Sequence, residues 1–473
     1  MINVHTAQQV RDAEQAFFAA HPGVDLMQRA ADGLAAHAAQ LLEHAAGAVD
    51  ASRMLVAVGA GNNGGDGLYA AARLARQGCA VLLWLAGPKA HPAALDDARA
   101  AGCQLVDAAR AAEAVAEVDL VMDAVLGIGG RPGLDRAVAV LAQEARLLGV
   151  PVLAVDLPSG LDADAGTPTD QSFHATRTVA LGALKPCHVL QPAASRCGRV
   201  ELVDIGLELP QPWAVAAQPG DVARLWPVPG PTSDKYSRGV VGIDTGSVHY
   251  PGAALLGTTG ALHAGAGMIR FVGPGPADGI IRATLPSVTH GEGRVQAWLV
   301  GSGWGSEPTD EQRLARRLAD GLPTVVDADA LQLLPDELPA GCLLTPHAGE
   351  LARMLGVERE AVTADPIGHA RRAAERWRAV VLLKGATQYV VQPTGEVRLA
   401  VPGPHWSAQA GSGDVLAGIC ATMLAAGLDA AEAGLLGASV QAMAAHRRPG
   451  PFPPDDIARE VAAVVGGFAP AGL

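Results

Sequence analysis

Apolar residues in this chain come in short continuous runs, separated by stretches in which they recur at helical spacing. Residues 6–20 and 24–46 have the spacing of amphipathic helices. The short runs that follow are typical of strands buried on both faces of a parallel sheet and linked by helices. In the first half these runs are residues 53–59, 80–87, 119–127, 150–160, 177–183 and 199–206.

A second α/β series begins after a stretch of different character. Residues 206–231 are rich in proline, which interrupts both helices and strands. Further apolar runs then occupy residues 239–247, 268–275, 297–305, 323–331, 342–350, 379–391 and 396–403. We therefore predict an N-terminal Rossmann-like, three-layer αβα domain (1–212), a proline-rich linker (213–230) and a C-terminal α/β domain (231–473).

Composition narrows the class of protein. Of the 473 residues 49% are hydrophobic and 18% are charged, and the formal net charge is −13. This charge gives no general attraction to nucleic acid or to an anionic membrane, so local geometry must hold any bound phosphate. The N-terminus lacks a signal-peptide pattern, no apolar run reaches membrane length, and the six cysteines show no metal-binding spacing. We expect a cytoplasmic protein with reduced thiols.

The turn after the first buried run, GAGNNGGDG at 59–67, carries more polar atoms than a phosphate requires. Where a parallel strand enters a helix, free backbone N–H groups and the helix dipole attract anions, and glycines allow close approach. Glycine-rich turns are common in connections that bind nothing. Asn62, Asn63 and Asp66 are therefore the residues that distinguish this one.

Two later strand ends add oxygen donors and a second flexible loop. Asp123 precedes GIGGRPG at 127–133, and Asp156 and Ser159 lie in VDLPSG at 155–160. Ligands of open parallel sheets bind beyond the carboxyl ends of the strands, so we expect these groups to meet in one crevice. A single buried carboxylate is usually structural, whereas several together favour a cation site or acid–base chemistry.

The motifs GNNGGDG, DAVLGIGG and VDLPSG resemble, in this order, those of the NAD(P)HX epimerase family, the YjeF N-terminal domain, over roughly residues 1–210. That family interconverts the two epimers of hydrated NADH or NADPH. The resemblance implies that Asp156 is catalytic and contacts the substrate, and that Asn63, Asp123 and Ser159 bind a potassium ion. It implies substrate contacts from two loops, namely Asn62, Asn63, Gly64, Gly65 and Asp66, and Gly127, Ile128, Gly129, Gly130, Arg131, Pro132 and Gly133. The family's second loop is closer to GTGL, so this chain lacks a threonine hydroxyl there.

The turn AGSGDVLAG at 410–418 is the strongest chemical motif of the second half. A Gly-x-Gly-Asp turn that opens an apolar helix surrounds a phosphoryl group with N–H groups and lets Asp414 reach an attacking hydroxyl. The alternative is that Asp414 only complements the helix dipole. Lys384 ends another strand, where an ammonium suits phosphate, and His347 ends a third. Of Asp327 and Asp329, at least one is expected to cap a helix.

Together with residues 233–267, VGSGWG, VDADAL and LLTPHAGE, this turn resembles the NAD(P)HX dehydratase family, the YjeF C-terminal domain of ribokinase-like fold, over roughly residues 225–470. The resemblance implies that Asp414 is catalytic. It implies substrate contacts from Ala253, Gly303, His347 and Asp414, and adenine-nucleotide contacts from Lys384, Gly385, Ala386, Thr387, Gln388 and Gly413. Ser412 replaces a more frequent threonine but keeps the hydroxyl, and SGWG departs from the usual GPGLG around Gly303.

The two resemblances together imply one function, the repair of NADHX and NADPHX by a fused isomerase and lyase. The dehydratase is expected to use ADP, with Mg²⁺ at the donor phosphates, and to form AMP, phosphate and NAD(P)H. One alternative is a ribokinase-like vitamin-precursor kinase with an NAD-sensing N-terminal domain. Another is a non-enzymatic NAD-binding protein, against which the intact Asp156 and Asp414 argue. The resemblance also implies a homo-oligomer, of which a tetramer is one form.

Overall fold

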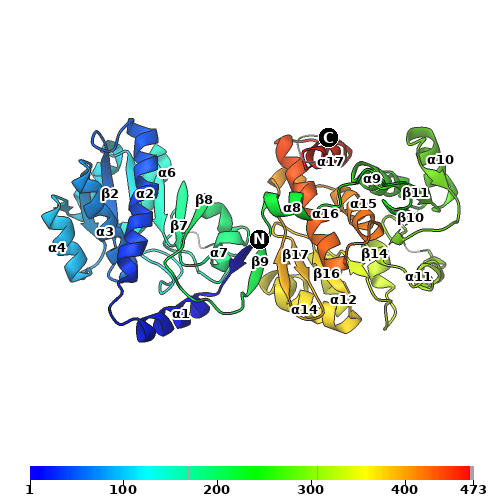
Figure 1. Ribbon diagram of the computed structural model, residues 1–473, viewed down its shortest axis with the longest axis horizontal. Helices are drawn as coiled ribbons and strands as arrows, with labels where there is room; N and C mark the ends of the chain where they lie inside the picture. Colours follow the sequence, from blue (N-terminus) through cyan, green and yellow to red (C-terminus); the bar gives the residue numbers. More distant parts are fainter. Residues whose placement is uncertain (169–170, 306, 469–473) are drawn as a thin grey trace. The chain divides into compact units, whose positions relative to one another are not determined.

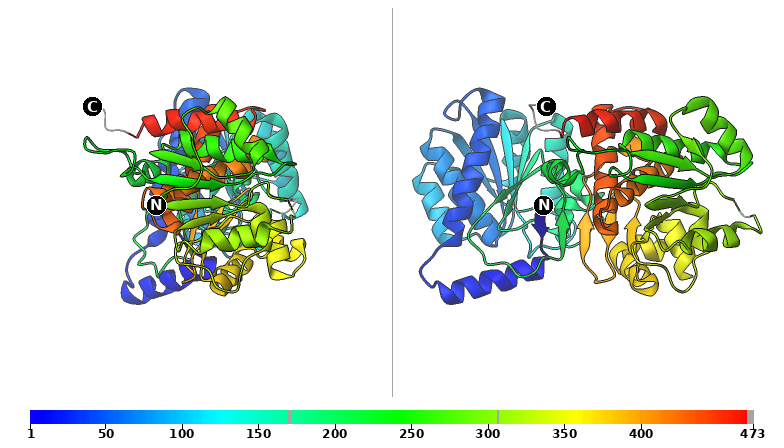
Figure 2. Two further views of the ribbon diagram at one scale, coloured as in Figure 1. Left: turned by 90° about the vertical axis from the view of Figure 1, so that its right-hand side faces the viewer. Right: turned by 45° about the vertical axis from the view of Figure 1, so that its right-hand side comes forward.

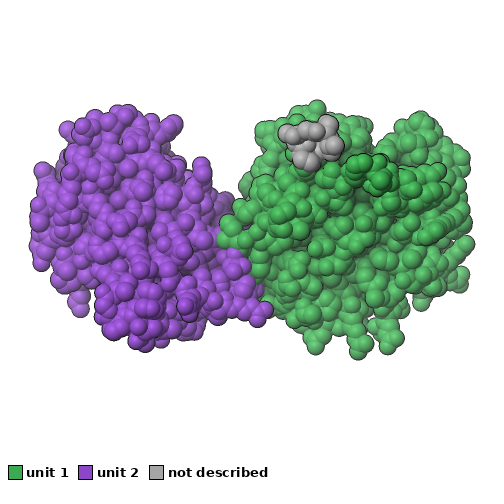
Figure 3. Space-filling view, in the orientation of Figure 1, with its two compact units in different colours: residues 1–2, 214–473 green, residues 3–213 purple. Residues whose placement is uncertain are grey.

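The chain forms two compact units, each with its own sheet (Figures 1 and 3). The computed structural model describes residues 1–168, 171–305 and 307–468. The N-terminal unit is Asn3–Trp213, and the C-terminal unit is Met1–Ile2 with Ala214–Leu473. Both units are α/β folds built mainly on parallel strands, which confirms the predicted fold class.

The described part of the N-terminal unit has a seven-stranded parallel sheet in the order β4-β3-β2-β5-β6-β7-β8. In β2, Met54 and Val56 pack on one face with α2 (Leu26–Ala46) and α3 (Asn62–Arg76), while Leu55 and Ala57 pack on the other with α6 (Arg136–Leu148). Because both faces are covered, the strand is apolar throughout. The strands are β2 (Arg53–Val58), β3 (Ala80–Leu85), β4 (Gln104–Val106), β5 (Leu120–Ala124), β6 (Val152–Val155), β7 (Arg177–Leu181) and β8 (Arg199–Val203).

The first helix of this unit, α1 (Ala7–Ala20), follows β1 (Ile2–Val4) and begins at a capping box. The Gln9 N–H donates to Thr6 Oγ1 at 3.2 Å, and the Thr6 N–H donates to the Gln9 side chain at 2.9 Å. One turn later, Arg11 donates to the carbonyl of Ile128 at 3.0 Å, so α1 is tied to the 127–133 loop. The other helices are α4 (Pro92–Ala100), α5 (Ala108–Ala114) and α7 (Pro186–Val189), with 3₁₀ turns η1 (Val115–Glu117) and η2 (Ala193–Arg196).

The sheet of the C-terminal unit runs in the order β9-β18-β17-β16-β15-β14-β13-β10-β11-β12. Its strands from β16 to β12 are parallel, whereas β17 is antiparallel to both of its neighbours. The bounds are β9 (Ala214–Ala216), β10 (Val240–Asp244), β11 (Met268–Phe271), β12 (Thr289–His290), β13 (Ala297–Val300), β14 (Thr324–Val326), β15 (Leu343–Leu344), β16 (Val380–Leu383), β17 (Tyr389–Val391) and β18 (Val397–Leu399).

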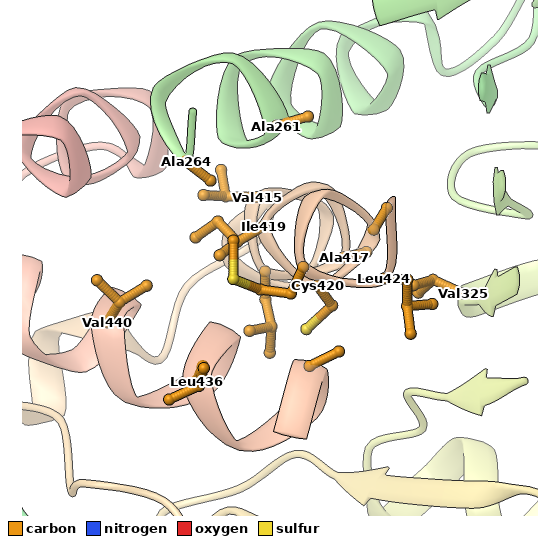
Figure 4. Packing of buried hydrophobic residues seen from close by; sticks show 14 of the residues in the cluster. Ala261, Ala264, Val325, Val415, Ala417, Ile419, Cys420, Leu424, Leu436 and Val440 are labelled. Atoms are coloured by element: carbon orange, nitrogen blue, oxygen red, sulfur yellow. The ribbon is translucent and has the colours of Figure 1, made fainter. Parts of the chain in front are cut away.

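The helix that follows the Gly-x-Gly-Asp turn is buried at the centre of this unit. Figure 2 shows it on the same side of the sheet as α9, α16 and α17, and Figure 4 shows its apolar side chains between α9 and α16. A Cβ on Gly418 would lie 1.9 Å from the Gly257 carbonyl oxygen, so main chain meets main chain there. The helices are α8 (Pro219–Leu225), α9 (Pro251–His263), α10 (Gly275–Thr284), α11 (Asp310–Leu318), α12 (Ala348–Leu355), α13 (Arg359–Ala364), α14 (Pro366–Trp377), α15 (Ser412–Ala425), α16 (Ala430–Arg447) and α17 (Pro454–Gly466), with 3₁₀ turns η3 (Ala328–Gln332) and η4 (His405–Ser407).

The stretch predicted as a linker, 213–230, contains folded elements. Strand β9 and helix α8 both lie within it, and Val222 and Trp226 are buried in the core of the C-terminal unit. Pro219 does not interrupt α8, because it occupies the first turn, where a backbone N–H has no partner inside the helix. Pro219 therefore marks the start of a short helix, and the prediction of a linker across the whole stretch was wrong.

Candidate active sites

The sheet order of the N-terminal unit brings the three predicted strand ends together. Strand β5 pairs with β2 on one side and with β6 on the other. The carboxyl ends of these neighbouring strands carry the glycine-rich turn, Asp123 and Asp156 in that order. The predicted crevice is thus formed by adjacent strands, as the topology of an open parallel sheet requires.

Asp123 and Ser159 are in direct contact and fully buried. The Ser159 hydroxyl donates to Asp123 Oδ1 at 2.6 Å, and the Ser159 N–H donates to Oδ2 at 2.7 Å. The Leu126 N–H in turn donates to the Ser159 hydroxyl at 2.8 Å. Burial raises the pKa of Asp123 to about 6, although these hydrogen bonds oppose the shift. In the described part of the chain this carboxyl group has no ion-pair partner.

The third predicted potassium ligand, Asn63, faces the start of the second loop. A Cβ on Gly127 would lie 2.9 Å from Asn63 Oδ1, so the amide packs directly against this glycine. Within the described residues the Asn63 Nδ2 is buried without a hydrogen-bond partner. An orphaned amide near a buried carboxyl and a serine hydroxyl fits a monovalent cation, because rotation of the amide would present a third oxygen.

The remaining predicted substrate residues of this unit divide into a buried and an exposed group. Gly64, Gly65 and Asp66 are buried in the first two turns of α3, and Asn62 at its start is exposed. In the second loop Gly127, Ile128 and Gly133 are half-buried, whereas Gly129, Gly130, Arg131 and Pro132 are exposed. Arg131 pairs with Asp135 on the surface, so its charge is already satisfied within the loop region.

Asp156 is held by residues that sequence reasoning did not place in the site. Lys185, which is fully buried, forms an ion pair with its carboxylate, and the Leu181 N–H donates to Oδ1 at 3.2 Å. His188 Nδ1 accepts the Lys185 N–H at 3.0 Å, so its Nε2 carries the hydrogen and donates to the Asp156 carbonyl at 2.9 Å. Asp156 also has a φ of 66°, a strained conformation for a non-glycine residue.

In the C-terminal unit, most predicted nucleotide residues line one cavity of about 560 Å³. Lys384 faces it from the carboxyl end of β16, and Asp414 faces it from the start of α15. Of the predicted residues, His347, Lys384, Gly385, Ala386, Gln388, Gly413 and Asp414 line this cavity. Thr387, Ala253 and Gly303 are not among its lining residues. Ala253 and Gly303 nevertheless meet, since a Cβ on Gly303 would lie 2.6 Å from the Ala253 Cβ.

A carboxylate cluster surrounds Lys384 in this cavity. Lys384 Nζ lies 2.7 Å from Asp327 Oδ1 and 3.8 Å from Glu350 Oε2. Asp327 also accepts hydrogen bonds from Ser302 at 2.8 Å and Thr345 at 2.7 Å, so it anchors the lysine. Burial opposes the charge of Lys384, but these carboxylates raise its pKa above the usual value. Asp327 is the N-cap residue of η3, as expected for one of the two, but its side chain makes no capping hydrogen bond. Asp329 instead accepts the Gly305 N–H at 2.8 Å.

Asp414 lies in the first turn of α15, next to Gly413, on which a Cβ would lie 3.1 Å from Lys384 Nζ. Burial raises the pKa of Asp414 to about 7; the negative charge of Asp327 adds to this shift, and Lys384 opposes it. A carboxyl group with this pKa is suited to accept a proton near neutral pH. Its environment therefore goes beyond complementing the helix dipole.

The cavity also contains residues that carried no motif. Residues 402–405 and 407–409 form much of its lining, with Gln441, whose side-chain amide donates to the Ser412 carbonyl at 2.8 Å. His347 lines it with a half-exposed ring, although its Nδ1 accepts the Gly349 N–H at 3.0 Å as a helix cap. Sequence reasoning treated 396–403 as a strand and did not interpret the turns after it, because they have no periodic pattern.

The departure at SGWG has a structural explanation. Trp304 is fully buried, its Nε1 donates to the Asp244 carbonyl at 2.8 Å, and the Arg313 guanidinium lies 4.4 Å from the ring centroid. Arg313 and Arg317 both pair with Asp244, which is itself buried. The tryptophan thus completes a buried network with Asp244 and Arg313 behind the Gly303 turn. Gly303 and Gly305 on either side of it keep the left-handed backbone conformation.

Two family models match the chain, one in each unit. The model described as YjeF-related protein N-terminus matches residues 23–187, and the model described as NAD(P)H-hydrate dehydratase matches residues 241–451. The chain is 42% identical over 458 residues to a bifunctional NAD(P)H-hydrate repair enzyme of Mycobacterium leprae, covering 94% of each chain. This chain belongs to the bifunctional NAD(P)H-hydrate repair enzymes.

The family assignment has further support from sequence. A bifunctional NAD(P)H-hydrate repair enzyme of Mycobacterium tuberculosis is 41% identical over 446 residues, covering 92% of this chain and 91% of the relative. The N-terminal unit is therefore the NAD(P)H-hydrate epimerase domain, and the C-terminal unit is the dehydratase domain. This membership decides against the vitamin-precursor kinase and the non-enzymatic alternative.

Solved structures confirm the ribokinase-like fold of the C-terminal unit of this repair enzyme. An ADP/ATP-dependent NAD(P)H-hydrate dehydratase from Bacillus subtilis, co-crystallised with ATP and Mg²⁺, matches with a TM-score of 0.52 and 24% identity, over 54% of this chain and 99% of that one. A ribokinase-like superfamily protein from Enterococcus faecalis matches with a TM-score of 0.51 and 20% identity, over 55% and 99%. Among the described residues, the helices are too short or too polar to cross a membrane.

For this repair enzyme we expect kcat/KM of dehydration to fall about tenfold for each pH unit below about 7. Asp414 must be ionised to accept a proton, and its pKa is raised to about 7, so activity is present above this pH and lost below it. Initial rates of NADH formation from the substrate epimer at low concentration, between about pH 5 and pH 9, measure the profile. A rate that stays constant from pH 8 to about pH 5 would contradict the assignment.

Proposed function

We propose that the dehydratase domain phosphorylates the hydroxyl group of S-NADHX or S-NADPHX with ADP as donor. Asp414 accepts the hydroxyl proton while the oxygen attacks the terminal phosphoryl group, and AMP leaves. The ring nitrogen next to the modified carbon then expels phosphate, and loss of a proton from the adjacent ring carbon forms the C=C bond that restores NADH or NADPH. The observation that carries this proposal is the position of Asp414, half-buried at the start of α15 in the same cavity as Lys384.

The nucleotide is proposed to lie along Lys384, Gly385, Ala386, Thr387, Gln388 and Gly413. Lys384 holds its position through Asp327 and supplies a point charge at the phosphates. A magnesium ion at the donor phosphates would neutralise charge that develops during transfer. Glu350, whose carboxylate lines the cavity close to Lys384, is the residue that would hold this ion. Ala253, Gly303 and His347 are proposed to contact the hydrated ring.

The epimerase domain is proposed to interconvert R- and S-NAD(P)HX at Asp156. The reacting carbon carries a hydroxyl next to the ring nitrogen, whose lone pair assists C–O bond breaking. What the protein must supply is proton transfer and fixed charge. The loops 62–66 and 127–133 are proposed to hold the substrate. Asn63, Asp123 and Ser159 would hold a potassium ion, which would contribute positive charge at the crevice.

The assay that tests this function follows the near-ultraviolet absorbance of NADH. The protein is mixed with both NADHX epimers, Mg²⁺, K⁺ and either ADP or ATP. Recovery of all the NADH with ADP supports both activities and the donor, and recovery that stops partway indicates an inactive epimerase domain. No recovery with either nucleotide would rule out the proposed function.

Ser159→Ala should raise the potassium concentration that gives half-maximal epimerisation by about 10–100-fold. The change removes a hydroxyl that is proposed to bind the ion and that donates to Asp123 at 2.6 Å. Chromatography of the epimers at a series of K⁺ concentrations, with constant ionic strength, measures the effect. Ser195→Ala, an exposed hydroxyl whose contact is with the Pro192 carbonyl, is the control. An unchanged K⁺ titration for Ser159→Ala would remove Ser159 from the ligand set.

A further inference from the structure

The N-terminal unit gathers more carboxyl groups around Asp156 than a single proton shuttle requires. Asp66 and Asp156 are both buried, with exposed fractions of 8% and 5%. Asp66 lies in the second turn of α3, which follows β2, and Asp156 follows β6. Because β5 lies between those two strands, the two carboxyl groups belong to opposite sides of the crevice. Glu14, half-buried on α1, is a third carboxyl group whose charge reaches both.

The two buried carboxyl groups have opposite surroundings. Asp156 forms an ion pair with Lys185 and accepts a hydrogen bond from the Leu181 N–H. For Asp66 the described residues contain no ion-pair partner, and the charged groups that face it are Asp156, Glu14 of α1 and Asp25 at the start of α2. Burial, followed by these three negative charges, raises the pKa of Asp66 well above its usual range.

Epimerisation through loss and return of the hydroxyl needs two proton transfers, one on each face of the ring. The departing oxygen must take up a proton on the first face. The water that adds to the second face must lose one. A site with one protonated and one ionised carboxyl group can supply both at neutral pH, and different surroundings for two titratable groups are the usual sign of such a division.

We propose that the epimerase works with two carboxyl groups, Asp66 as the proton donor to the departing hydroxyl and Asp156 as the acceptor for the water that adds to the opposite face. This deepens the proposed epimerase function and rests on it. As the C–O bond breaks, its electron pair stays on oxygen, which takes the Asp66 proton and leaves as water. At the same time, the lone pair of the ring nitrogen forms a C=N bond to the reacting carbon.

The second half of the reaction restores the hydrate and exchanges the roles. Water adds to the opposite face, the C=N electrons return to nitrogen, and the released proton passes to Asp156. One water is lost and one is gained, so no other reactant is needed. Asp156 is then protonated and Asp66 ionised, which is the state that converts the other epimer. The same pair therefore serves both directions, as an epimerase requires.

The test measures epimer exchange by chromatography without ADP or ATP, so that the dehydratase domain cannot act. Asp66→Asn should slow exchange about 100-fold or more, and Asp66→Glu should recover part of the rate. With ADP, recovery of NADH from the S epimer alone should stay at the wild-type rate in both variants, which shows that the protein is folded. The matched control is Asp96→Asn, an exposed carboxyl group on α4 that should change none of these rates.

A second readout is independent of activity. The infrared difference spectrum of the wild-type protein minus Asp66→Asn at neutral pH should contain the C=O band of a protonated carboxyl group. The bands of other protonated carboxyl groups, such as Asp414, are common to both proteins and cancel. Wild-type exchange in Asp66→Asn would overturn the proposal, as would absence of that band from the difference spectrum. Loss of exchange in Glu14→Gln with normal exchange in Asp66→Asn would assign the donor to Glu14 and equally overturn it. If the wild-type protein shows no exchange at all, the proposed epimerase function itself fails.

Discussion

Asp414→Ala should reduce ADP-dependent recovery of NADH by about 10³–10⁴-fold and leave epimer exchange at the wild-type rate. Removal of the carboxyl group takes away the proposed acceptor for the hydroxyl proton, and such an acceptor is worth up to about 10⁴-fold in general-base catalysis. Absorbance of NADH measures the first activity, and chromatography without nucleotide measures the second. Asp336→Ala, which alters an exposed carboxyl group, should match the wild-type enzyme in both.

The isosteric variant Asp414→Asn separates loss of the base from loss of packing. It should be as inactive as the alanine variant but should melt at a higher temperature than the wild-type enzyme at pH 8. The reason is that a carboxyl group with a raised pKa favours the folded state at low pH, and this advantage is lost as the pH rises through about 7. An asparagine does not ionise. Normal recovery in either variant would exclude Asp414 as the base.

Asp156→Asn should stop NADH recovery partway, at the amount set by the S epimer present at the start. The expected loss of enzymatic exchange is about 10³-fold, and the remaining R epimer should then convert only at its uncatalysed rate. Asparagine is a better replacement than alanine, because it tolerates the positive φ of this position. It also keeps the size and the hydrogen-bonding capacity of the side chain. The amplitude of recovery from a known epimer mixture is the measurement.

The stability control for this variant follows from the ion pair with Lys185. Asp156→Asn leaves a buried ammonium without its partner, which should lower the free energy of unfolding by about 3–5 kcal/mol. The double variant Asp156→Asn with Lys185→Met removes both charges and should regain most of that stability while remaining inactive in exchange. Complete recovery of both epimers at the wild-type rate by Asp156→Asn would show that another group carries the reaction.

The sequence was informative where the residues of a site are close together in the chain. Each predicted strand end and glycine-rich turn consists of one apolar run and the few residues that follow it, so a short motif could reveal it. The strand order then placed Asp123 between the other two ends, as expected for an open parallel sheet. The cavity residues Lys384 and Asp414 could be found for the same reason, since each ends or begins a regular element.

What the sequence did not reveal depends on tertiary contacts. Lys185 follows a different strand, β7, and nothing local to it indicates that its side chain returns to Asp156. Asp327 stands at the N-cap of η3, but its pairing with Lys384 could not be predicted, because it joins residues 57 positions apart. The proline-rich stretch 213–230 also misled, since the burial of Val222 and Trp226 decides that it is part of a folded unit.

The close contact of α9 with α15 makes the two walls of the dehydratase cavity unequal in their tolerance of substitution. The wall that carries Asp414 is backed by main-chain contact between Gly257 and Gly418, so few substitutions at these glycines can be accepted without shifting α15. On the other, residues 402–411 contain little regular structure beyond η4 and can change in length and sequence more freely. Contacts to a bound nucleotide can therefore change on the variable wall while Asp414 keeps its position.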